Sequence, residues 1–257
     1  MENGSVSVKD IYDIIDGIAP FASQEAWDNS GLMMGECNRQ DKGIYFALDL
    51  TRQAAEAAIS KGANLIVTHH PIMFSGRKNL TEADWEGKML CLLVRNEVSV
   101  ISAHTNLDKA AGGVSERLAQ AIGLQDIAPV EGDEDGYLRI GRISPLSLEQ
   151  FVKHVGLVLD APIRAYGDKD KLISNVAVAG GSAGEYAFAA KSAGADAYVT
   201  GEMRYHDCVN LAQEGMATLQ AGHDASEKIV LGPLMDHVRN ELDKRGVKVT
   251  LISENND

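Results

Sequence analysis

Two adjacent histidines, His69 and His70, come directly after a short apolar run at residues 65–68. Such a run is typical of a buried strand, so the two imidazoles stand at its carboxyl end. Neutral imidazole is a common ligand of borderline divalent metal ions. For a histidine pair standing alone, a structural role with hydrogen bonds to backbone carbonyls is the commoner interpretation. The rest of the chain favours a metal site.

The same arrangement occurs twice more along the chain. A β-branched run ends in His104 with Asp108 four residues later, and another apolar run leads to His223 with Glu227 four residues later. Each run has about the length of a strand and precedes a helix-like pattern. We therefore expect all three polar clusters at the same edge of one mostly parallel sheet, which is where open α/β sheets bind ligands.

The side chains of these clusters favour nitrogen and oxygen ligation of metal. Imidazoles and carboxylates suit zinc, iron, manganese or nickel, whereas iron–sulfur and structural zinc centres need clustered thiolates, and the three cysteines lie far apart. The side chains of His69 and His70 diverge in an extended chain, which favours one histidine for each of two ions. His223 and Glu227 can point the same way from a helix start, and such a carboxylate could bridge two ions.

The apolar periodicity predicts alternating helices and strands. An amphipathic helix lies near residues 7–18, and the turn-rich stretch Trp27–Gly31 follows it. Strands are predicted at 44–48, 64–68 and 99–103, with helices between them at 52–61 and 82–96. This alternation is the βαβ pattern of an α/β fold.

The second half of the chain resembles the first. Residues 57–70 align without gaps on residues 189–202, and seven of the fourteen positions are identical. This similarity predicts two related α/β lobes with mostly parallel sheets, and clefts between lobes are favoured binding sites. We expect lobe one at 1–124, a connecting region at 125–172 and lobe two at 173–257.

The composition excludes several classes of function. With 24 Lys and Arg against 37 Asp and Glu, the formal net charge of -13 argues against general binding of nucleic acid or of an anionic membrane. The first residues have no signal-peptide pattern, and no apolar run approaches the roughly 18 residues of a membrane span. We therefore expect a cytoplasmic protein.

Five short motifs follow one another along the chain. They are Trp-Asp-Asn-Ser-Gly-Leu at 27–32, Thr-His-His-Pro at 68–71, Ser-Ala-His-Thr-Asn-Leu-Asp at 102–108, Thr-Gly-Glu at 200–202, and Gly222-His223 followed by Glu227. Together they resemble the NIF3-like family, also described as GTP cyclohydrolase I type 2 homologs, in its short form without an inserted domain. The motifs run from residue 27 to 227, so the resemblance covers nearly the whole chain.

This resemblance implies a two-lobed NIF3-like fold with a dinuclear divalent-metal centre, assembled as a toroidal homohexamer. By motif position, His70 and Asp108 would hold one ion, and His69 and His223 the other. Glu227 would bridge the two ions.

Two positions depart from the family pattern. Asp224 stands where an aromatic residue is common, and Ser226 stands where a threonine is common. Asp224 could alter the local charge or add a ligand, which leaves the identity of the metal open.

The leading hypothesis is a metal-dependent hydrolase of a small molecule such as a nucleotide, with GTP ring opening as the activity that the family name implies. His104 is the candidate for proton transfer or for orienting a neighbouring ligand, and a structural strand-end histidine is the alternative. A non-catalytic metal-binding scaffold or regulatory interaction protein is the second hypothesis. Phosphoester hydrolysis is a third, because the same two ions would permit it.

Four further features have less specific interpretations. Arg77 could receive a phosphate group, although solvated loop charge is the commoner interpretation. Glu202 could line the site or cap the helix that follows it. The glycines at 180–184 lack the lysine of a phosphate loop, so a tight turn explains them. The Trp27–Gly31 stretch could shape a wall of the site, but it offers no obvious catalytic residue.

Overall fold

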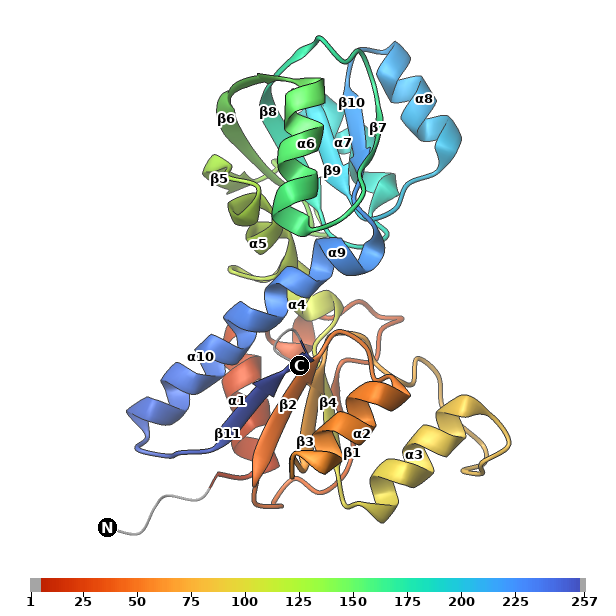
Figure 1. Cartoon of the computed structure of the whole chain (residues 1–257), viewed down its shortest axis with the longest axis vertical. Coiled ribbons are helices and arrows are strands. Elements are labelled where there is room, and N and C mark those ends of the chain that lie inside the picture. The colour runs from red at the N-terminus through yellow and green to blue at the C-terminus, as the bar shows by residue number, and fades with distance from the viewer. Residues whose placement is uncertain (1–5, 255–257) are drawn as a thin grey trace. The chain divides into compact units, whose positions relative to one another are not determined.

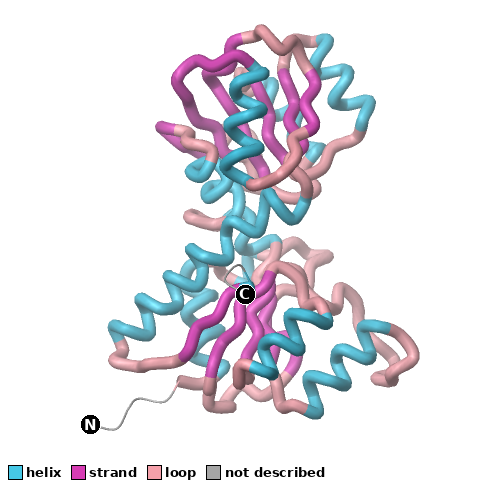
Figure 2. Tube along the Cα trace, in the orientation of Figure 1, coloured by secondary structure: helices cyan, strands magenta, loops and turns pink. Residues whose placement is uncertain are grey.

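The computed structural model describes residues 6–254, which form two compact units. Unit 1 comprises residues 6–107 and 231–254, and unit 2 comprises residues 108–230. Each unit has a sheet with helices packed against it (Figures 1 and 2). None of the described helices combines the length and the apolar character that a membrane span requires.

Unit 1 is built on a five-stranded sheet. Its strands are β1 (Gly31–Met34), β2 (Gly43–Ala47), β3 (Leu65–Thr68), β4 (Ser99–Ser102) and β11 (Thr250–Ser253), in the spatial order β1-β4-β3-β2-β11. β11, β2, β3 and β4 are parallel to one another, and only β1 is antiparallel, at the edge. Every residue of β2, β3 and β4 is buried, as in parallel sheets covered on both faces. The expectation of a mostly parallel sheet is confirmed here.

Helices cover both faces of this sheet. They are α1 (Val8–Ile18), α2 (Arg52–Ser60), α3 (Trp85–Arg95) and α10 (Leu231–Lys244), with the short 3-10 helix η1 (Phe21–Ser23). α2 and α3 pack on the face that carries Tyr45, Ile66 and Val100. Figure 1 shows α1 and α10 on the other side of the sheet. The helices and strands predicted for this region all form, whereas the edge strand β1 and the C-terminal strand β11 were not predicted.

Unit 2 contains a six-stranded mixed sheet. Its strands are β5 (Gln125–Pro129), β6 (Arg139–Ser147), β7 (Arg164–Tyr166), β8 (Leu172–Ala179), β9 (Ala197–Thr200) and β10 (Ala217–Gln220), in the spatial order β5-β6-β8-β9-β10-β7. Only β8, β9 and β10 are parallel, while β5, β6 and β7 pair antiparallel with their neighbours. The expectation of a mostly parallel sheet is therefore wrong for this unit.

Helices also pack on both faces of the second sheet. The helices of unit 2 are α5 (Val114–Ala121), α6 (Leu148–Leu159), α7 (Ala187–Ser192), α8 (Tyr205–Gln213) and α9 (His223–Glu227), with 3-10 helices η2 (Gly184–Tyr186) and η3 (Lys228–Val230). α5 and α6 join one core with Val176 and Val178, whereas α7 and α8 join another with Ala177 and Ala179. This alternation along β8 follows from the two-residue period of a strand. The short α4 (Thr105–Lys109) contains the point where the chain leaves unit 1.

The two units divide the chain differently from the expected lobes. The segment expected as a connecting region, 125–172, supplies β5, β6, α6 and β7 to unit 2. The C-terminal part of the expected lobe two belongs to unit 1, where β11 pairs with β2. Pairing between strands far apart in the sequence decides both differences. β5 is mostly exposed, so its sequence contains no apolar run that would predict a strand. The aligned segments 57–70 and 189–202 both form a helix followed by a strand.

The three strand-end clusters do not all lie on one sheet. β3 and β4 are parallel neighbours in unit 1, so the expectation of a shared edge holds for the clusters that follow them. β10 lies in the sheet of unit 2. The expectation of a single sheet is therefore wrong for His223 and Glu227, because similar local patterns cannot show which sheet a strand joins.

Candidate metal centre

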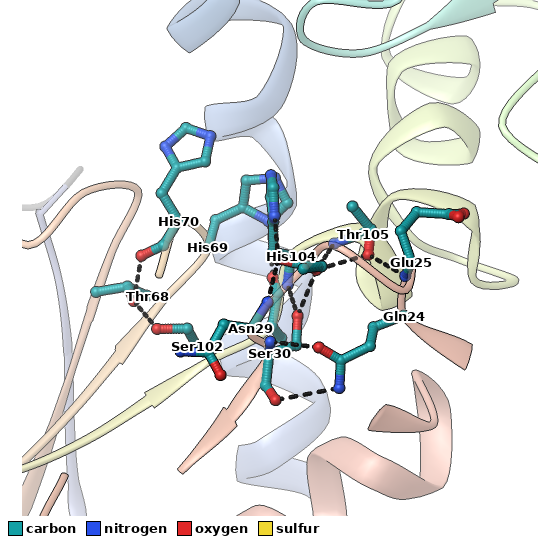
Figure 3. A network of polar contacts seen from close by, with 12 residues as sticks. Gln24, Glu25, Asn29, Ser30, Thr68, His69, His70, Ser102, His104 and Thr105 are labelled. Atoms are coloured by element: carbon teal, nitrogen blue, oxygen red, sulfur yellow. Dashed lines mark hydrogen bonds and ion pairs between the residues drawn. The ribbon is translucent and has the colours of Figure 1, made fainter. Parts of the chain in front are cut away.

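Two neighbouring strands of unit 1 place three histidines at one edge of the sheet. Thr68, the last residue of β3, lies opposite Ser102, the last residue of β4. Their hydroxyl oxygens are 2.8 Å apart, and Thr68 Oγ1 donates to the carbonyl oxygen of His70 at 2.9 Å (Figure 3). His69 and His70 follow β3 directly, and His104 follows β4 after one intervening residue. These hydrogen bonds hold the chain where the histidines leave the strands.

The end of β2 supports the histidine pair from the neighbouring position in the sheet. The backbone amides of His69 and His70 donate to the carbonyl oxygen of Leu48 at 3.2 and 3.0 Å. The amide of Leu48 donates to the carboxylate of Glu254 at 2.9 Å. Asp49, the next residue, accepts a hydrogen bond from His70 Nδ1 at 2.8 Å. Asp49 was missed in the sequence, where its only signal is a carboxylate just after a predicted strand.

All three imidazoles use Nδ1 in a hydrogen bond to an oxygen. Nδ1 of His69 lies 2.8 Å from the carbonyl oxygen of Ala103, and Nδ1 of His70 and of His104 lies 2.8 Å from a carboxylate oxygen. Because carbonyl and carboxylate oxygens accept, Nδ1 carries the hydrogen in each ring. Nε2 of each neutral ring then presents its lone pair, which is the arrangement usual for metal-ligating histidines.

Asp28 is the carboxylate that orients His104. Its Oδ1 accepts from His104 Nδ1 at 2.8 Å and from the amide of Asn29 at 2.7 Å. Its Oδ2 accepts from the hydroxyls of Thr105 at 2.6 Å and Ser30 at 2.9 Å, and from the amide of Thr105 at 3.1 Å. The Asp28 side chain is completely buried. Five hydrogen bonds therefore fix one carboxylate behind one imidazole.

These hydrogen bonds also determine the charge of Asp28. Burial acts to raise its pKa, but the hydrogen bonds from His104 and Thr105 outweigh burial and hold the pKa below the ordinary value. The Trp27–Gly31 stretch thus carries a residue that positions His104, and a turn-forming aspartate was the only sequence signal.

The three histidines are close enough to act as one group. One ring nitrogen from each lies within 4.8 Å of the others. The ring centroids of His69 and His70 are 4.9 Å apart, and those of His69 and His104 are 5.3 Å apart. His69 is buried, whereas His70 and His104 are partly accessible. The sequence-predicted residues of unit 1 are therefore brought together as a group that could hold a metal.

Unit 2 carries the remaining predicted ligands. Nε2 of His223 lies 3.2 Å from a carboxylate oxygen of Glu227, one helical turn away on α9. Glu227 is only 3% exposed although it is a glutamate. A carboxylate oxygen of Asp108 lies within 4.8 Å of one of Glu227. Unit 2 thus brings together one imidazole and two carboxylates.

Glycine backbone packs tightly around Glu227. A Cβ atom on Gly181, whose φ is +65°, would lie 2.1 Å from Glu227 Oε1. A Cβ atom on Gly201 would lie 2.7 Å from the hydroxyl of Ser226. That hydroxyl accepts from the amide of Gly181 at 3.0 Å and donates to the carbonyl oxygen of His223 at 2.8 Å. The sequence predicted only a tight turn for the glycines at 180–184. In the structure, the missing side chain of Gly181 also leaves space for Glu227.

The departures from the family pattern differ in their surroundings. Ser226 is completely buried in the contacts just described, whereas Asp224 is exposed. Glu202 places a carboxylate oxygen 3.6 Å from Nδ1 of His223, longer than a hydrogen bond. α8 begins after Arg204 without a side-chain cap, so Glu202 does not cap this helix.

Arg77 has a structural role in the loop after the histidine pair. Its guanidinium donates to Asp84 at 2.8 Å and to Glu86 at 2.6 Å. These two hydrogen bonds raise the pKa of Arg77 above its ordinary value. Asp84 also caps α3 by accepting from the amide of Gly87 at 2.7 Å. Binding of a phosphate by Arg77 would compete with these contacts, which favours the structural interpretation.

Known proteins resemble this chain over nearly its whole length. A Clostridium perfringens protein described as a GTP cyclohydrolase 1 type 2 homolog is 32% identical over 248 residues, which cover 93% of each chain. The crystal structure of a Staphylococcus aureus hypothetical protein matches with a TM-score of 0.91 at 24% identity, over 98% of this chain and 97% of that chain. A Bacillus cereus protein related to NIF3 matches with a TM-score of 0.89 at 23% identity, over 96% of both chains. The model of the family Duf34/NIF3 (NGG1p interacting factor 3) matches residues 6–257, and the chain therefore belongs to this family.

Proposed function

We propose that this protein is a metal-dependent hydrolase of a small molecule, with a dinuclear divalent-metal centre. The observation that carries the proposal is the group of three histidines in unit 1, each with Nδ1 bonded to an oxygen so that Nε2 presents a lone pair. A relative is described as a GTP cyclohydrolase 1 type 2 homolog, which supports a nucleotide as the substrate and ring opening by water as the reaction.

The donor atoms suit a borderline divalent ion. Both units supply imidazole nitrogens or carboxylate oxygens, so zinc, iron, manganese and nickel all fit. In this assignment His70 and Asp108 would hold one ion, His69 and His223 would hold the other, and Glu227 would serve both ions.

Proton transfer is assigned to His104. When bound, two divalent ions supply a water of lowered pKa and polarise the bond that it attacks. Nε2 of His104 can accept a proton while Nδ1 keeps its hydrogen bond to Asp28. The carboxylate of Asp28 then stabilises the imidazolium, and its hydrogen bond keeps the ring from rotating.

The first test is metal content per chain, measured by elemental mass spectrometry on protein purified without added metal or chelator. We expect about two ions per wild-type chain and a sharp fall in Glu227→Gln, which keeps the size of the side chain but removes its charge. Glu56→Gln is the matched control, because Glu56 is an exposed carboxylate on α2. GTP turnover should fall together with metal content in Glu227→Gln and stay unchanged in Glu56→Gln.

Two results would contradict the proposal. Well-folded wild-type protein that neither contains nor takes up divalent ions would exclude the metal centre. Two ions without turnover of GTP or of other nucleotides would exclude the hydrolase and leave the second candidate.

The second candidate is a non-catalytic metal-binding scaffold or regulatory interaction protein. The family description contains an interacting factor, which supports a binding role in some members. A scaffold would keep its protein partner when Glu227→Gln abolishes any turnover. Co-purification of the same partner by wild-type and variant protein distinguishes this candidate from the hydrolase.

A cytoplasmic homohexamer is also part of the proposal. The hexamer rests on the resemblance of the five motifs, and native mass spectrometry should detect six chains of 27.6 kDa. The three cysteines form no disulfide, in keeping with a reducing compartment, and cell fractionation tests the location.

A further inference from the structure

Two large aromatic side chains flank His104 and remain more than half exposed. The ring centroid of Trp27 lies 5.9 Å from that of His104, and the ring centroid of Phe74 lies 5.7 Å from it. Both rings stand nearly perpendicular to the imidazole, at 75°. Trp27 is 63% exposed and Phe74 is 52% exposed. Aromatic residues this accessible beside a candidate catalytic group are typical of a binding surface.

The loop that carries Trp27 is held on both sides. Asp28 is fixed by the five hydrogen bonds described above, and its amide donates to the carbonyl oxygen of Glu25 at 3.0 Å. Ser30 is held by Gln24, which accepts from its amide at 2.6 Å and donates to its carbonyl oxygen at 3.3 Å (Figure 3). The exposed indole therefore extends from a fixed backbone.

The loop that carries Phe74 is tied to the first loop. Nδ2 of Asn29 donates to the carbonyl oxygen of Met73 at 2.6 Å. This hydrogen bond joins the residues next to the two aromatic side chains, and Arg77 holds the same loop through its two carboxylate partners. Two loops far apart in the sequence thus present their aromatic rings together beside His104.

We infer that Trp27 and Phe74 bind the planar heteroaromatic ring of a small-molecule ligand by stacking, and so hold it beside His104. Every purine and pyrimidine has a π-face, so any of the bases can stack on an aromatic side chain. No charged side chain is needed for this contact, in keeping with an Arg77 already engaged by two carboxylates. The inference rests on the proposed function, because the ring is taken to belong to the substrate of the same centre.

The chain contains an internal control for this inference. It has two tryptophans, and Trp85 is as exposed as Trp27, at 63%. In the variant Trp85→Phe, Trp27 is the only tryptophan and reports on its own surroundings. Saturable quenching of its fluorescence by GTP, ATP or CTP is expected in metal-loaded protein, whereas inorganic tripolyphosphate, which has no ring, should leave it unchanged.

Affinity measurements complete the test. In titration calorimetry, Trp27→Ala and Phe74→Ala should each weaken nucleotide binding about fivefold or more. Trp85→Ala should bind as wild type does. Tripolyphosphate affinity and metal content should be equal in all four proteins, and Trp27→Phe should restore most of the nucleotide affinity. The restored affinity separates stacking from a general disturbance of the loop.

Three results would overturn the inference. They are the absence of saturable quenching by any of the three nucleotides, wild-type nucleotide affinity in both Trp27→Ala and Phe74→Ala, and a parallel loss of tripolyphosphate affinity in these variants. The proposed function fails separately. Nucleotide stacking without turnover would retain this inference and exclude the hydrolase. Turnover that does not depend on Trp27 or Phe74 would retain the hydrolase and exclude this inference.

Discussion

The candidate ligands of the two units are held in place by different interactions. In unit 1, hydrogen bonds of 2.8 Å from Nδ1 to oxygen set the rotation and tautomer of each histidine. In unit 2, glycine backbone packs directly against Glu227, and Gly181 has no space for a Cβ atom. A hydrogen bond can lengthen or exchange its partner, whereas a Cβ atom on Gly181 would displace the carboxylate of the buried Glu227 itself. We therefore expect substitutions at the unit 1 hydrogen bonds to lower turnover and metal affinity by degrees. Substitution of Gly181 in unit 2 should lower stability and metal content abruptly.

The largest effect is expected for Gly181→Ala. The new methyl group would overlap Glu227 Oε1, and the positive φ adds backbone strain. We expect the free energy of unfolding to fall by about 2–4 kcal/mol and metal content to fall with it. Denaturant unfolding and elemental mass spectrometry measure the two effects.

Gly194→Ala is the matched control for that change. Gly194 also has a positive φ, +84°, but a Cβ atom there would meet nothing within 4 Å. It should cost only about 1–2 kcal/mol, from backbone strain alone. Equal losses of unfolding free energy in Gly181→Ala and Gly194→Ala would mean that overlap with Glu227 adds nothing to the backbone strain.

The next largest effect is expected for Asp28→Asn. The uncharged asparagine side chain cannot stabilise a protonated His104, and its NH2 group cannot accept the hydrogen bonds that a carboxylate oxygen of Asp28 accepts. Turnover of GTP should therefore fall about 100-fold or more. Metal content should stay at the wild-type level, because Asp28 orients His104 and not the assigned ligands. Loss of metal in Asp28→Asn would show that His104 itself is a ligand and would break the assignment of roles within unit 1.

A smaller effect is expected when the carboxylate behind a ligand histidine is changed. Asp49→Asn weakens the hydrogen bond to His70 Nδ1 and should lower metal affinity about tenfold or more. Glu202→Gln should change it much less, because the corresponding distance to His223 is 3.6 Å. Competition with a chromophoric chelator measures both affinities. A larger loss of metal affinity in Glu202→Gln than in Asp49→Asn would contradict this prediction. It would mean that the carboxylate near His223 in unit 2 supports its histidine more than the carboxylate bonded to His70 does in unit 1.

The smallest effect compares two carboxyl groups within unit 1. Among the described residues, neither carboxyl oxygen of Asp41 has a hydrogen-bond partner. Burial, with a contribution from the charge of Asp10, raises its pKa to about 7. Asp28 has the opposite shift because five donors surround it.

The raised pKa of Asp41 gives a defined pH dependence. Between about pH 4 and pH 7 the folded state holds a proton that the unfolded state has released, so stability falls as pH rises through this range and then levels off. Asp41→Asn should remove this fall. It should be about 1–2 kcal/mol more stable relative to wild type at pH 8 than at pH 5, measured by thermal unfolding. An equal difference at both pH values would contradict the raised pKa.

The part of the site that could be predicted from sequence is the part encoded by local patterns. The apolar runs before His69 and His104 are continuous strands buried on both faces, so their ends could be located. Asp28 and Asp49 could not be assigned as partners, because each bonds to a histidine far along the chain. The mixed sheet of unit 2 was missed because its antiparallel strands carry weaker and more exposed patterns.

By itself, the sequence determined the types of the candidate ligands, their position after strands, and the family to which the chain belongs. Only the tertiary structure decided which sheet each strand joins, which oxygen fixes each imidazole, and why Gly181 must lack a side chain. The physical reason is the separation along the chain over which each kind of interaction acts. Residue periodicity and turn chemistry act over a few residues, whereas strand pairing, burial and close packing join residues that the chain separates by tens to hundreds of positions.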